Sequence, residues 1–70
     1  MSASVNAASP VMIARTALLD AIASHRRAEL SISALYVAAD AYIAEIRAHG
    51  KRMGRKVPVP SRAHIIRALA

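Results

Sequence analysis

Large apolar residues recur at helical spacing in three separate stretches of this chain, and this pattern limits what it can fold into. In the first stretch Val11, Leu18 and Ile22 lie on one face of a helix. Leu35 and Ile46 belong to a second such face, and residues 65–69 form a third. The pattern predicts a mainly α fold, a small three-helix domain with helices over residues 10–28, 34–49 and 62–70.

Serine and glycine mark the expected helix ends. Ser9 precedes Pro10, which is the usual order of an N-cap and a first helical residue. Gly50 is expected at the C′ position after the second helix, and Ser61 at the N-cap of the third.

These boundaries also predict the domain organisation. We expect residues 1–9 to be a flexible N-terminus, residues 10–70 to be one domain, and residues 50–60 to be a basic loop that contains two prolines.

Residues 29–33 are open to two interpretations. Leu30 and Ile32 alternate with polar residues, which is typical of a short strand, and such a strand would pair across a homodimer. Alternatively the segment is a turn in which Ser31 or Ser33 caps the next helix.

The apolar side chains are small for a chain of 70 residues. Seventeen of them are alanines, and phenylalanine, tryptophan and cysteine are absent. A domain of this size is near the limit for folding alone, and no disulfide or thiolate metal site can stabilise it. We therefore expect a homodimer or a tight complex with another protein.

A core or dimer interface is expected from the larger apolar residues. The candidates share the apolar faces of the second and third helices or the segment before them: Leu30, Ile32, Leu35, Tyr36, Tyr42, Ile43, Ile46, Ile65, Ile66 and Leu69. No apolar run is long enough for a membrane span, and residues 1–10 do not resemble a signal peptide, so a cytoplasmic location without a membrane partner is expected.

Charge is strongly polarised along the chain. Residues 1–45 contain three arginines and all four carboxylates, whereas residues 46–70 contain seven lysines and arginines and no carboxylate. Such a cationic region attracts polyanions, and it predicts binding of duplex DNA. The expected phosphate-binding residues are Arg47, Lys51, Arg52, Arg55, Lys56, Ser61, Arg62 and Arg67.

Residues 61–69 read Ser-Arg-Ala-His-Ile-Ile-Arg-Ala-Leu, and two earlier segments, residues 30–33 and 34–49, precede them. In this order residues 29–70 resemble the ribbon-helix-helix repressors of the Arc and methionine-repressor type, whose second helix opens with a similar motif. The segment between the two helices is longer here than in the family, and His64 stands where the family prefers glutamate.

The resemblance implies a homodimer in which paired ribbons read base edges in the major groove. Base contacts would then come from outward ribbon residues, Ser31 and Ser33 with Glu29 and Arg27 beside them, or from His64. It implies a transcriptional regulator of the plasmid, phage or antitoxin type. A general helix-turn-helix is a second possibility, although residues 50–60 are long for its turn.

The residue pattern also bears on two other function classes. The three histidines lie on different segments and the carboxylates show no metal-ligand spacing, so we expect no catalytic residue, metal, cofactor or small-molecule substrate. The alternative to DNA binding is a small helical protein-interaction module, such as a phage-encoded inhibitor or adaptor of a host protein.

Overall fold

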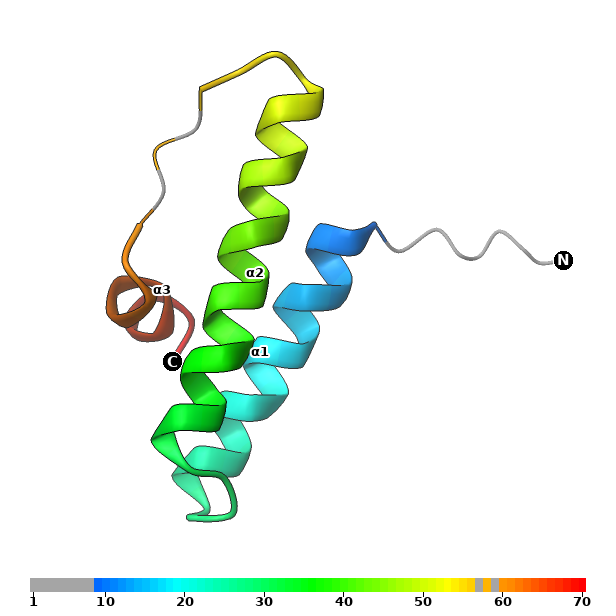
Figure 1. The fold of residues 1–70 in the computed structure, drawn as a ribbon. Coiled ribbons are helices and arrows are strands. Elements are labelled where there is room, and N and C mark those ends of the chain that lie inside the picture. Colours follow the sequence, from blue (N-terminus) through cyan, green and yellow to red (C-terminus); the bar gives the residue numbers. More distant parts are fainter. Residues whose placement is uncertain (1–8, 57, 59) are drawn as a thin grey trace, which may run out of the picture.

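The computed structural model of the chain describes residues 9–56, 58 and 60–70. Three helices follow one another: α1 (Pro10–Arg26), α2 (Ile32–Arg52) and α3 (Arg62–Leu69). Helices α1 and α2 lie side by side in opposite directions, and the short α3 lies on the side of α2 away from α1 (Figure 1). The expected mainly helical, three-helix fold is confirmed, and no strand occurs in the part of the chain that the structure describes.

Helix α1 begins as expected and ends two residues early. The Ser9 hydroxyl accepts a hydrogen bond from the Met12 amide at 3.2 Å, and Pro10 is the first helical residue. At the other end Ala28 has a positive φ of 60°. The Ala28 amide donates to the His25 carbonyl and the Glu29 amide to the Ser24 carbonyl, both at 2.9 Å. These two bonds form a Schellman motif, which ends the helix at Arg26 rather than at residue 28.

Residues 29–33 form a turn and the start of α2, so the strand interpretation is wrong for this structure and the turn interpretation is right. The Ser31 hydroxyl accepts from the Ala34 amide at 3.2 Å and caps α2. A hydrogen bond of 2.9 Å joins His25 Nδ1 to the Leu30 carbonyl oxygen. Ile32 is the first residue of α2, two residues before the expected start, because the Ser31 cap begins the helix there.

Helix α2 continues past its expected end. Gly50 is buried inside the helix, so its assignment to the C′ position is wrong. The left-handed residue is Gly54, whose φ is 70°. The Arg55 amide donates to the Gly50 carbonyl at 2.8 Å and the Gly54 amide to the Lys51 carbonyl at 3.1 Å, which is a second Schellman motif. The loop is therefore a connector of residues 53–61, of which residues 57 and 59 lie outside the described part, as do residues 1–8 of the expected flexible N-terminus.

Helix α3 begins where the sequence predicts and ends at Leu69, one residue before the expected end. The Ser61 hydroxyl accepts from the His64 amide at 3.2 Å. One core joins the three helices, and its buried residues are Leu18, Ile22, Leu35, Ala39 and Ile65.

The expected interface residues mostly serve this core within one chain. Leu35 and Ile65 are buried, and five others pack against the buried residues: Tyr42, Ile43, Ile46, Ile66 and Leu69. Ile32 remains exposed. The core alternative of this prediction thus holds for seven of the ten residues within a single chain, and their use in a dimer or partner interface stays a prediction.

The two left-handed helix ends predict opposite effects of matched substitutions. Ala28→Gly should raise the free energy of unfolding by about 0.5–1 kcal/mol, because glycine adopts a positive φ without a Cβ penalty. Gly54→Ala should lower it by about 1 kcal/mol through the backbone alone, since a Cβ at Gly54 meets no atom within 4 Å. Urea denaturation followed by far-UV circular dichroism measures both, and equal signs would contradict the assignment of these helix ends.

The core predicts a large effect at Leu35 and a small one at its exposed neighbour. Leu35→Ala should lower the free energy of unfolding by about 2–5 kcal/mol, because the buried side chain leaves a cavity. Val37→Ala, at a residue 69% exposed, should change it by less than about 0.5 kcal/mol. Thermal melts of both variants test the core. Similar losses of stability in the two variants would show that Leu35 is not a core residue.

Candidate nucleic-acid interface

Residues 46–70, here called the cationic segment, extend over three structural elements. Arg47, Lys51 and Arg52 lie in the last turns of α2, and the connector and α3 contribute two basic residues each: Arg55, Lys56, Arg62 and Arg67. All seven side chains are exposed. The structure therefore presents the predicted cations to solvent and buries none of them.

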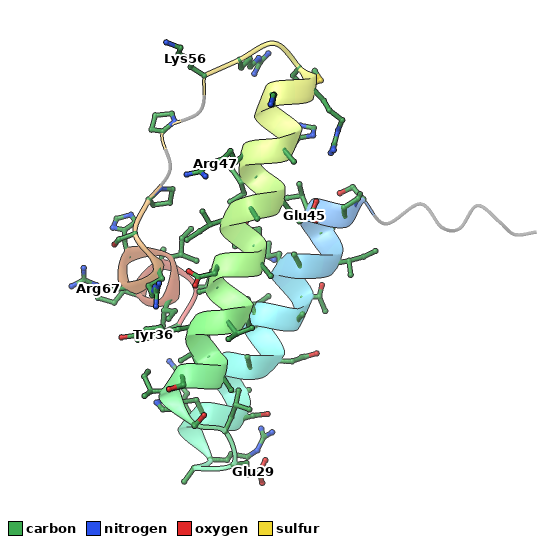
Figure 2. The ribbon with its side chains drawn as sticks, in the orientation of Figure 1. Glu29, Tyr36, Glu45, Arg47, Lys56 and Arg67 are labelled. Carbon is green, nitrogen blue, oxygen red and sulfur yellow. The ribbon has the colours of Figure 1, made fainter. Side chains whose placement is uncertain are left out.

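The connector and α3 lie on the side of α2 away from α1 (Figure 1). Figure 2 shows Arg47 projecting from α2 toward the side of the connector and α3, whereas Glu45 projects toward α1. Lys56 on the connector and Arg67 on α3 lie on the same side as Arg47 (Figure 2). Basic side chains from three consecutive elements thus share one side of α2.

In the described residues, one cation of the cationic segment forms an ion pair with a carboxylate. Within residues 9–56, 58 and 60–70, Arg62 is the one cation of the segment in an ion pair: its Nε lies 3.4 Å from Asp40 Oδ1 on α2. The other ion pair in these residues joins Arg27 to Glu29 at 3.0 Å, beside the turn between α1 and α2. The remaining six cations of the segment are available to an external anion.

Part of the charge has a local role in the helix. His49, Lys51 and Arg52 lie in the last turn of α2, where the helix dipole favours positive charge. A charged residue at such a position, as Lys51 and Arg52 are, contributes about 0.3–1 kcal/mol when exposed. This stabilisation explains some basic residues at this end, but it does not explain Arg55 and Lys56, which follow the helix end.

Arg62 is engaged within the chain, unlike the free phosphate contact that the sequence predicted. Its guanidinium carbon lies 5.1 Å from the centre of the Tyr36 ring, a cation–π distance. Tyr36 and Asp40 are four residues apart and therefore share a face of α2. Sequence reasoning missed this contact. The spacing of Tyr36 and Asp40 was a clue, because an aromatic ring and a carboxylate four residues apart on a helix can bind one arginine.

The predicted serine and histidine contacts lie at helix starts. Ser31 and Ser61 use their hydroxyls as N-caps, and Ser33 is exposed in the first turn of α2 rather than on a ribbon. His64 is exposed on α3. The structure therefore offers these side chains at helix ends, with no ribbon in the described residues to carry Ser31 and Ser33 into a groove.

The histidines and carboxylates are not gathered into a metal-binding group in the described residues. His25 is bonded to the turn carbonyl of Leu30, and His49 and His64 are exposed on different helices. None of the helices described has both the length and the apolar character needed to cross a membrane.

Comparison of the chain with protein-family models, with curated proteins and with solved structures gives no match.

Proposed function

We propose that this protein binds duplex DNA through the phosphates, using the exposed basic residues of the cationic segment. The observation that carries the proposal is the set of six exposed cations without a carboxylate partner in the described residues: Arg47, Lys51, Arg52, Arg55, Lys56 and Arg67. Long basic side chains neutralise phosphates and release counterions, which gives affinity without base reading.

The chemistry of the surface favours a duplex over a single strand. Single-stranded nucleic acids bind to exposed aromatic platforms on which bases stack. The chain has two tyrosines, both on α2; Tyr36 and Tyr42 are half-buried, and Arg62 covers the Tyr36 ring. The resemblance of residues 61–69 to the second helix of the ribbon-helix-helix repressors supports the same ligand.

We further propose that the protein is a transcriptional regulator that binds DNA as a homodimer, because a dimer gains affinity over a single chain. Two cationic segments on one duplex double the number of neutralised phosphates. Exposed apolar side chains outside the core are available for the contact, among them Val37 on α2 and Met12 and Ile13 on α1. Bound to a promoter, such a dimer would act by occlusion.

The proposal predicts a selective loss of DNA binding when the connector charge is removed. The triple variant Arg52→Gln, Arg55→Gln, Lys56→Gln should bind a random duplex of about two helical turns more weakly. The slope of log K against log salt should fall by about 0.9 for each phosphate that the variant no longer neutralises. Fluorescence anisotropy of a labelled duplex, measured from low to moderate salt, gives both values.

A matched control removes three cations that lie outside the cationic segment, on α1 and in the turn that follows it. Arg15→Gln, Arg26→Gln, Arg27→Gln changes the net charge equally but alters α1 and its turn. It should keep most of the salt slope. Equal losses in the two triple variants would show that net charge alone attracts DNA, and wild-type protein that ignores the duplex would refute the proposal.

A second candidate function uses the same charge toward a protein. Val37 is 69% exposed and Ile32 46% exposed, and such side chains are suited to contact with a partner. In that case the chain is an adaptor or inhibitor whose cationic segment meets an acidic surface. Light scattering distinguishes the functions: the DNA-binding dimer has twice the chain mass and gains mass with duplex, whereas the adaptor gains none.

A further inference from the structure

Arg62 differs from the other cations of the cationic segment. It is the first residue of α3, and it contacts α2 twice, through Asp40 and through the face of Tyr36. The Asp40 and Arg62 side chains are each 51% exposed, so the contact lies at the surface, within reach of an external anion.

Helix α3 depends on contacts with α2 for its position. Eight residues are too few for a stable helix in isolation. Ile65 is buried and Ile66 and Leu69 are partly buried against the core, which holds one face of α3. Arg62 adds a second attachment at the point where the connector enters the helix.

We propose that Arg62 is a positioning residue that latches α3 to α2, and that it is not itself a phosphate ligand. This inference rests on the proposed DNA binding. The latch keeps Arg67, which lies on the outer side of α3 in Figure 2, on the same side of α2 as Arg47 and Lys56. Asp40 and Tyr36 therefore affect DNA binding without contacting DNA, because they help to hold α3 in place.

The chemistry of the guanidinium supports this role. A planar guanidinium can present its edge to a carboxylate and its face to an aromatic ring at the same time, which a lysine ammonium does less well. A phosphate that bound Arg62 would have to share the guanidinium with Asp40, and its negative charge would then lie close to this carboxylate. The free cations nearby offer phosphates a site without that penalty.

Two carboxylate substitutions give opposite expectations for a latch and for a ligand. Both Asp40→Asn and Glu45→Gln remove one negative charge from α2, but Glu45 projects toward α1 and is in no ion pair among the described residues. Glu45→Gln therefore measures the general electrostatic gain. If Arg62 is a latch, Asp40→Asn binds the duplex more weakly than Glu45→Gln, by up to about fivefold. Equal or tighter binding by Asp40→Asn would mean that freeing Arg62 helps, which overturns the proposal.

A double-mutant cycle tests the link from Arg62 to Arg67. Arg67→Ala should reduce the salt slope of wild-type protein by about 0.9, the value for one phosphate. In the Arg62→Ala background the same change should have a smaller effect, because α3 then holds Arg67 less firmly beside Arg47 and Lys56. Full additivity of the two changes would show independent phosphate contacts and refute the latch.

The free protein provides a test that does not require DNA. The Tyr36 ring should shift the NMR signals of the Arg62 side chain upfield, and Tyr36→Leu should remove this shift while the signals of α1 stay unchanged. Absence of the upfield shift in the wild-type protein would exclude the latch. If every variant and the wild type failed to bind duplex while the shift was present, the proposed function would fail and the latch would stand as a contact of the fold.

Discussion

The packing of α1 against α2 is the interaction on which the rest of the structure depends. Leu18 and Leu35 are the largest fully buried side chains, and Ala39 between the helices is fully buried as well. A small residue at this point lets the two helices approach closely, so that a chain poor in large apolar residues still excludes water from a core. Helix α3 then completes the core with Ile65, on a surface that the pair has already formed.

Capping interactions at the helix ends determine where most of the helices begin and end. Ser9, Ser31 and Ser61 each accept a hydrogen bond at 3.2 Å from the amide three residues later, and each begins a helix. Both long helices end in Schellman motifs, one with Ala28 and one with Gly54 in the left-handed position. These bonds satisfy backbone groups that a short helix would otherwise leave to solvent, and they fix where the chain changes direction.

The fold brings basic residues that are distant in the sequence to the same side of the molecule. Helix α2 carries basic residues out along its last turns, and the connector returns past them to α3 (Figure 1). Cations that are far apart in sequence, such as Arg47 and Arg67, come to share one side of the molecule (Figure 2). An extended arrangement of exposed cations suits a ligand with regularly spaced phosphates, whereas a single small anion would use only part of it.

The order of residues was enough to predict that three helices form, where α1 and α3 begin, and that positive charge is concentrated in residues 46–70. Periodicity, N-caps and charge are local properties, and each can be read without knowledge of the partner surfaces. Tertiary structure decided the rest. It placed Gly50 inside α2 because the helix end with the left-handed residue formed at Gly54, and it made residues 29–31 a turn because Ser31 capped α2. It also paired Arg62 with Tyr36 and Asp40, since only the docking of α3 brings side chains more than twenty residues apart in sequence into contact.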